Sequence, residues 1–406
     1  MAHQKFFAYA VPLFLFFIAL EYIYTKKKGK NYFQFTETVA NLNVGIAERL
    51  LDVFTIVPFY YFFDYIYSHY ALFHFKIGIA AYICLFLLTD LVWYWYHRLA
   101  HEVNIFWAVH IVHHQSDDFN YTVSARITVF QSVVRCLFWA ALPLMGFPPS
   151  LIAVFLLIHG IYPFFTHTQA IEKLGWLEYI IVTPSHHRVH HSSNPEYLDK
   201  NYGDMLIIWD KIFGTFVEED AAPSYGLTKP LNSHSFLWQH FHYILELSLA
   251  FRSAEGFQAK MEVLFGRPEV IDPRYRLYLE KKLLNIKPSV PTTSVMRLYI
   301  SSQTTASLVL LFCLIYWIDG LSFIQTFLLS TFIIVSLINS GAIMEQRNWI
   351  FYLEYFRMII LLTGVWLYFP NMLTGIAILM FLLTLVYFFR PIRKKYFELM
   401  YHTALG

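Results

Sequence analysis

The sequence has few charged residues and few cysteines. Of its 406 residues 14% are charged, with a net charge of +2, whereas about a quarter of the residues of a soluble domain are charged. This composition gives no concentrated basic face, so we expect no nucleic acid partner. The three cysteines stand in apolar runs without a CxxC pair, which predicts neither disulfides nor a thiolate metal site. The sequence also has no GxGxxG-type stretch that would indicate a bound flavin or nicotinamide.

Apolar residues make up 57% of the chain, and 19% of all residues are aromatic. Because about 20 apolar residues cross the hydrocarbon core of a bilayer, we predict an all-α polytopic membrane protein with about nine transmembrane helices. The predicted spans are 6–24, 42–65, 72–96, 127–145, 149–166, 298–318, 321–342, 349–369 and 371–390. The first has no cleavage site and is interpreted as an uncleaved anchor. The fourth and fifth are short and joined by a Pro-rich turn, so a re-entrant hairpin is the alternative there.

Basic residues gather in alternate loops of this predicted topology. They lie at 26–30, 167–297, 345–347 and 390–395, whereas the loops near 66, 146, 319 and 370 hold no Lys or Arg. By the positive-inside rule we expect the basic face and the C-terminus in the cytoplasm. A bacterial inner membrane and an endoplasmic reticulum both fit. Three regions are predicted: N-terminal helices over 1–66, a histidine-rich catalytic region over 67–297, and a four-helix transmembrane bundle of low polar content over 298–406.

Eleven of the eighteen histidines lie between residues 97 and 191. Eight of them form one HxxxH pair and two HxxHH groups, and these three groups are all predicted near one face of the membrane. A lone histidine at a helix end is usually solvated, but three such groups on one face favour a metal site. Residues three and four apart share a helix face, so we expect His187, His190 and His191 to aim their rings at one point. His186 is expected to stay outside the ligand set.

The number of converging imidazoles is too large for one ion and suits two. Imidazole-rich sites without thiolates suit iron and oxygen chemistry. We therefore predict a di-iron site at the cytoplasmic face. A haem would use only two axial histidines, and a transporter would need polar residues through the midplane. Asp90 and Glu102 are predicted to act in catalysis by orienting ligand rings. The predicted ligands are His97, His101, His110, His113, His114, His187, His190 and His191, and the family resemblance described next adds His167.

Two stretches carry a family resemblance. They are "HRLAHEVNIFWAVHIVHHQSDDFNYTVSARITVFQS" and "HTQAIEKLGWLEYIIVTPSHHRVHHSSNPEYLDKNYGDMLIIWDKIFGTF". These stretches resemble the fatty acid hydroxylase/sterol desaturase superfamily, and most of all its ether-cleaving branch. The chain departs from the family at Pro163, where the family carries His or Gln four residues before His167. His159, one turn earlier, is the candidate replacement.

The resemblance implies a membrane-bound di-iron monooxygenase with a lipid substrate. It would hydroxylate the carbon next to the ether oxygen of an alkylglycerol, and the product would release a fatty aldehyde. An external electron donor is required, and the resemblance suggests tetrahydrobiopterin. The alternative is a hydroxylase or desaturase of a fatty acyl, sterol or carotenoid substrate with the same di-iron core.

Overall fold

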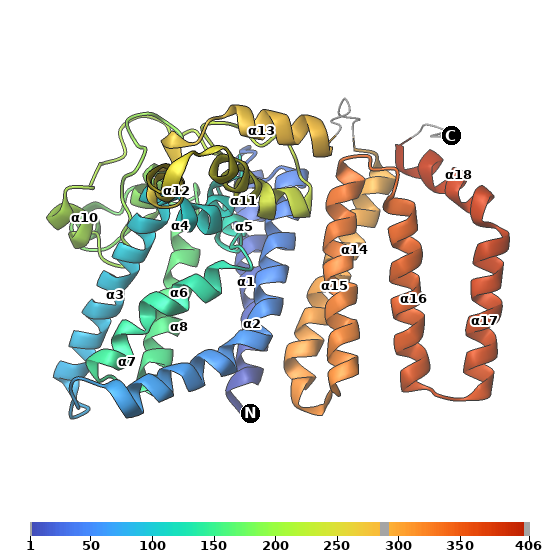
Figure 1. The fold of residues 1–406 in the computed structure, drawn as a ribbon, viewed down its shortest axis with the longest axis horizontal. Coiled ribbons are helices and arrows are strands. Elements are labelled where there is room, and N and C mark those ends of the chain that lie inside the picture. Colours follow the sequence, from blue (N-terminus) through green and yellow to red (C-terminus); the bar gives the residue numbers. More distant parts are fainter. Residues whose placement is uncertain (1, 285–291, 402–406) are drawn as a thin grey trace. The chain divides into compact units, whose positions relative to one another are not determined.

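The computed structural model describes residues 2–284 and 292–401, which divide into two compact units. The larger unit comprises residues 16–232 and 239–284, and the C-terminal unit comprises residues 2–15, 233–238 and 292–401. The described residues are helical (Figure 1), and extended pairing among them is limited to two isolated bridges, Ile181 with Leu206 and Ser192 with Tyr225. The predicted all-α fold is therefore confirmed for the described part of the chain.

The helices up to residue 284 are α1 (Ala2–Lys27), α2 (Phe35–Tyr70), α3 (Ile79–Glu102), α4 (Asn104–His110), η1 (Ile111–His114), α5 (Tyr121–Ser124), α6 (Gln131–Trp139), α7 (Ala141–Met145), α8 (Pro149–Thr166), η2 (Gly175–Tyr179), α9 (Pro184–His190), α10 (Ile208–Phe213), α11 (Phe236–Ser253), α12 (Gly256–Phe265), η3 (Pro268–Val270), α13 (Arg274–Leu279) and η4 (Glu280–Leu284). The C-terminal unit continues with α14 (Ser294–Trp317), η5 (Ile318–Gly320), α15 (Phe323–Met344), α16 (Ile350–Tyr368), α17 (Met372–Tyr387) and α18 (Phe389–Tyr401).

Six described helices are long and apolar enough to cross a membrane, or seven if the bent pair α17 and α18 is one span. The six segments are Ala8–Lys27, Ile79–Glu102, Pro149–Thr166, Ser294–Gly320, Phe323–Met344 and Ile350–Tyr368. These segments are typical of an integral membrane protein. They fall short of the nine spans predicted from the sequence.

Two predicted spans differ from the structure for physical reasons. The run 42–65 belongs to the 36-residue helix α2, which carries Glu48, Arg49 and Asp52 and contains Pro58. A proline removes one backbone hydrogen bond and bends a helix, and Figure 1 shows α2 change direction along its length. The run 127–145 forms the consecutive short helices α6 and α7. Together they make the apolar segment Gln131–Met145, which is shorter than the roughly 20 residues that a span needs.

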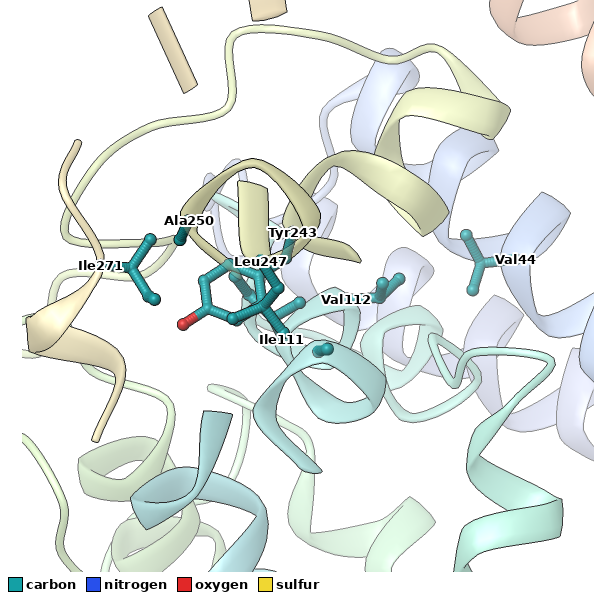
Figure 2. Close-up of a cluster of buried hydrophobic side chains, with 8 residues drawn as sticks. Val44, Ile111, Val112, Tyr243, Leu247, Ala250 and Ile271 are labelled. Atoms are coloured by element: carbon teal, nitrogen blue, oxygen red, sulfur yellow. The ribbon is translucent and has the colours of Figure 1, made fainter. Parts of the chain in front are cut away.

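The elements that carry histidines pack at one end of the larger unit. Beyond α3, the short helices α4 and η1 bury Ile111 and Val112 against α11. Figure 2 shows Tyr243 and Leu247 of α11 facing Ile111, with Val44 of α2 on the far side of Val112. Burial of large apolar side chains contributes about 1.5–3 kcal/mol each. This packing fixes η1, which carries His113 and His114, against α11.

The C-terminal unit has a polar centre that its low overall polarity does not predict. Glu354 of α16 accepts hydrogen bonds from Asn339 Nδ2 (2.6 Å), from Tyr299 of α14 and from Tyr396 of α18 (3.3 Å). Arg357 Nη1 lies 2.7 Å from the same carboxylate. A carboxylate between apolar helices is costly unless it is fully paired. These contacts tie four helices of the unit to one side chain.

Candidate metal centre

Two groups of buried histidines lie at the end of the larger unit where α3 and α8 end. All nine predicted ligands belong to one or the other, and within each group one ring nitrogen per residue lies within 4.8 Å of the others. The five-histidine cluster is His97, His101, His110, His114 and His190, and the four-histidine cluster is His113, His167, His187 and His191.

Each HxxHH group contributes to both clusters. His187 of α9 belongs to the four-histidine cluster, and so does His191, the C-cap residue of this helix. His190 of α9 belongs to the five-histidine cluster. The expectation that these three rings aim at one point is therefore wrong. Successive residues of an α-helix are rotated by about 100° about its axis. Relative to His187, the ring of His191 is therefore rotated by about 40° in one direction and the ring of His190 by about 60° in the other. His113 is divided in the same way from His110 and His114.

Hydrogen bonds on the outer ring nitrogens fix the tautomer of several rings. In the five-histidine cluster, His97 Nδ1–H donates to the Tyr202 carbonyl (2.9 Å), and His110 Nδ1–H donates to Gln131 Oε1 (3.3 Å). In the four-histidine cluster, His113 Nδ1–H donates to the Arg126 carbonyl (3.1 Å). A proton on Nδ1 leaves the Nε2 lone pair free to bind a metal.

The same arrangement holds for His167, whose Nδ1–H donates to the carbonyl of Pro163 (2.6 Å). The main-chain carbonyl of residue 163 therefore orients the His167 ring, whichever side chain stands at that position. His159 does not replace the family's His or Gln, because its ring lies in a separate group with Asp90 and Asp204.

The inner nitrogens fit a cation in each cluster. His97 Nε2 lies 3.1 Å from His110 Nε2, and His113 Nε2 lies 3.2 Å from His167 Nε2. Because their protons are on Nδ1, each pair brings two lone pairs face to face, which repel unless a cation lies between them. Two nitrogens about 2.1 Å from one ion, at a right angle, lie about 3.0 Å apart.

Three further inner nitrogens point to the same conclusion. The Nε2 atoms of His101, His190 and His191 are buried without a hydrogen-bond partner. A buried polar atom without a partner costs free energy, and a metal ion would satisfy all three. The residues present therefore fit a metal in each cluster.

Burial keeps these rings in the neutral form that binds metals. Burial lowers the pKa of His167 to about 4. Burial, together with neighbouring rings, holds the pKa well below its usual value in His110, His113, His114, His187, His190 and His191. A neutral imidazole is the metal-binding form.

His186 is buried but belongs to neither cluster. Its Nδ1 accepts a hydrogen bond from the Thr183 main-chain N–H (3.2 Å), and the Thr183 side chain completes a capping box at the start of α9. Its position agrees with the expectation that it stays outside the ligand set.

The two predicted catalytic carboxylates do not contact the rings. Asp90 accepts from the main-chain N–H groups of Met205 (3.0 Å) and Leu206 (3.1 Å) and lies 3.5 Å from His159. Glu102 pairs with Arg98 (3.1 Å) and lies 3.5 Å from Arg267. Among the described residues, neither is hydrogen-bonded to any of the nine histidines. The outer partners are mostly main-chain carbonyls, which have no signature in the sequence.

Two buried clusters of imidazoles, at the end of helices of membrane-spanning length, are compatible with the class of non-haem, metal-dependent oxygenases. Residues 82–215 match the fatty acid hydroxylase family. The chain is 36% identical over 345 residues to an alkylglycerol monooxygenase of Homo sapiens, which covers 83% of this chain and 77% of that protein. It is 33% identical over 366 residues to an alkylglycerol monooxygenase of Danio rerio, which covers 88% of this chain and 82% of that protein.

A further relative matches a shorter stretch of the chain. An ornithine lipid hydroxylase of Rhizobium tropici is 35% identical over 127 residues, which covers 30% of this chain and 38% of that protein. No solved structure matches the chain. The chain therefore belongs to the alkylglycerol monooxygenase family, within the fatty acid hydroxylases, and is an oxygen-dependent lipid monooxygenase. The family predicted from the sequence is confirmed.

Proposed function

We propose that this protein is a di-iron monooxygenase that cleaves the ether bond of alkylglycerols, with tetrahydrobiopterin as the electron donor. The observation that carries the proposal is the presence of two histidine clusters in a chain whose relatives named alkylglycerol monooxygenase match it over more than four-fifths of its length. Five and four neutral imidazoles without thiolates suit two iron ions with open positions.

The proposed reaction balances with one dioxygen, two electrons and two protons. One oxygen atom enters the C–H bond of the carbon next to the ether oxygen, and the other leaves as water. The hydroxylated carbon is a hemiacetal, which collapses with cleavage of its C–O bond to give a fatty aldehyde and glycerol. When bound, the iron ions supply the activation of dioxygen and the removal of hydrogen from an unactivated carbon.

The chain's own residues would hold the ions and keep the site dry. The Nδ1–H bonds to Tyr202 and Pro163 fix rings of both clusters with their lone pairs inward. Tyr96, next to His97, lies in an apolar core with Leu85, Trp139 and Ile152. An apolar core therefore lies next to the proposed ligand His97 in α3, and apolar side chains of this kind suit the binding of a long alkyl chain.

We further propose that the histidine end faces the cytoplasm. Lys26 and Lys27 end α1, and Glu21, just before them, accepts a hydrogen bond from Thr168, which follows His167. The basic stretch 26–30 and the clusters therefore share one end of the larger unit. Positive charge beside a span favours the cytoplasmic side. The proposed count of nine spans requires α2 and the pair α6 and α7 to enter the membrane as well.

The test combines metal analysis of the purified protein with turnover of an alkylglycerol, with and without tetrahydrobiopterin. We expect about two iron atoms per chain and pterin-dependent release of fatty aldehyde. His187→Ala protein, prepared in the same way, controls for aldehyde from contaminating enzymes. A retained hydroxyl or a new double bond in a fatty acyl, sterol or carotenoid substrate would establish the alternative. Activity without iron would overturn the proposal.

A further inference from the structure

The segment 199–206, between α9 and α10, reaches three rings of the five-histidine cluster. The carbonyl of Tyr202 accepts from His97 Nδ1 (2.9 Å), and the carbonyl of Lys200 accepts from His190 Nδ1 (3.0 Å). Asp199 Oδ1 lies 3.9 Å from His101 Nδ1. In the four-histidine cluster, His113 and His167 donate to carbonyls from other parts of the chain, those of Arg126 and Pro163.

The backbone of this segment adopts an uncommon conformation. Asp199 and Asn201 have φ angles of 58° and 55°. These angles lie in the left-handed region, which few residues other than glycine, Asn and Asp adopt. Asn201 is held by its side chain, which donates to the Val217 carbonyl (2.7 Å) and accepts from the Val217 N–H (2.9 Å). Such a conformation persists only where its surroundings hold it.

Two buried carboxylates from other helices hold the amides that follow. Asp210 of α10 accepts from the N–H groups of Tyr202 and Gly203, both at 2.7 Å. Gly203 is required for this approach, because a Cβ there would lie 2.9 Å from Asp210 Oδ2 and 2.8 Å from the Leu206 carbonyl oxygen.

Asp90 of α3 holds the far end of the segment. It accepts from the N–H groups of Met205 and Leu206 and from Trp209 Nε1 (2.8 Å). Asp90 and Asp210 therefore accept hydrogen bonds from four of the five main-chain N–H groups of residues 202–206. Hydrogen bonds to a charged acceptor are roughly twice as strong as neutral ones.

We propose that Asp90 and Asp210 are positioning residues for the metal of the five-histidine cluster alone. Each carboxylate fixes amides of the 199–206 segment, the segment fixes two carbonyls, and the carbonyls orient His97 and His190. This inference rests on the proposed metal sites. It assigns the two carboxylates to one ion of the pair, through main-chain groups and not by contact with a ring.

The experiment measures iron affinity and stoichiometry in full-length protein, with Asp210→Asn and Asp90→Asn each placed in two backgrounds. In His187→Ala protein, which retains the five-histidine cluster, we expect each substitution to weaken the remaining iron by about 10–100-fold. In protein with both His101→Ala and His114→Ala, which leaves three rings in the five-histidine cluster and retains the whole four-histidine cluster, we expect no change in the remaining iron. Asp118→Asn is the matched control, because its buried carboxylate accepts from the Gln34 main-chain N–H (2.6 Å) outside the segment.

Each outcome has one meaning. Equal loss of iron in both backgrounds would mean general damage to the fold and would overturn the inference, as would unchanged affinity in His187→Ala protein. Failure of the unmodified protein to bind two iron ions would instead overturn the proposed function. Gly203→Ala adds a second route to the same segment, since it displaces Asp210 without removing a carboxylate. It should reproduce the selective loss.

Discussion

The Nε2 atoms of His167 and His187 lie 3.0 Å apart, although one residue follows α8 and the other belongs to α9. His187 Nδ1 is buried without a partner, so its ring is held by packing and by what lies at Nε2. Because the His167 proton is on Nδ1, its Nε2 offers a lone pair to His187. His187 Nε2 can donate its own proton to that lone pair, or the proton can move to Nδ1 so that both Nε2 lone pairs bind one cation.

Substitution of His187 should remove the iron of the four-histidine cluster only. We expect His187→Ala protein to retain about one iron atom per chain. His186→Ala protein should retain two and lose about 1 kcal/mol of stability, because His186 contributes to the cap of α9. Metal analysis and thermal unfolding of both variants test this. Loss of iron in His186→Ala with retention in His187→Ala would contradict the cluster assignment.

Pro163→Ala should leave both metal sites intact. The group that accepts from His167 is the carbonyl of residue 163, and every amino acid supplies that carbonyl. Alanine also removes the proline from the interior of α8, where it disturbs the helix. We expect iron content equal to that of the unmodified protein and an equal or higher melting temperature. A loss of iron would show that the proline ring itself is needed to aim His167.

Glu102→Gln should retain both iron ions. The Glu102 side chain is 21% exposed and pairs with Arg98 and Arg267, and exposed ion pairs contribute about 1 kcal/mol or less. The sequence-based expectation that Glu102 orients a ligand ring requires a hydrogen bond to that ring, and none is present among the described residues, so turnover should also be close to that of the unmodified protein. Metal content and turnover should be measured on one preparation. Loss of iron would contradict this prediction and restore a direct role at the rings.

Asp118 should make stability depend on pH. Burial raises the pKa of Asp118 to about 7, whereas in the unfolded chain it is about 4. Its contribution is therefore fully present below about pH 4 and is lost as the pH rises through about 7. Asparagine does not titrate, so Asp118→Asn should gain stability relative to the unmodified protein between pH 5 and pH 8. Thermal unfolding at several pH values tests this, and a constant difference would contradict it.

The histidine spacing was predictable because it is local. HxxxH and HxxHH place rings on a helix surface by geometry alone, so eight of the nine clustered residues could be grouped from spacing, whereas His167 was added by the family resemblance. The division of the histidines into clusters of five and four could not be predicted, because it depends on which segments of the chain pack against each side of α9. Distances from His187 to His167 and from His190 to Lys200 are set by tertiary packing.

Groups with no sequence signature account for most of what was missed. The carbonyls of Tyr202 and Arg126 orient rings, and any residue could supply them. The buried pair of His159 and Asp204 (2.6 Å) joins residues 45 apart in the chain. Glu354 is one acidic residue in an apolar stretch, and only the packed helices reveal its partners. Hydropathy marks 42–65 as a span although α2 carries charged residues and a proline there, so the count of nine spans stays a prediction.

Both clusters draw on segments that lie before and after α8 in the chain. His110 and His190 meet in one, and His113 and His187 meet in the other. An ion in either would join two distant parts of the polypeptide and restrict the unfolded chain, as a cross-link does. During synthesis the five-histidine set is complete only after His190 has emerged, and the four-histidine set only after His191. Loading of the proposed ions would therefore be a late event in biogenesis, and an ion that arrived earlier would meet only part of its coordination shell.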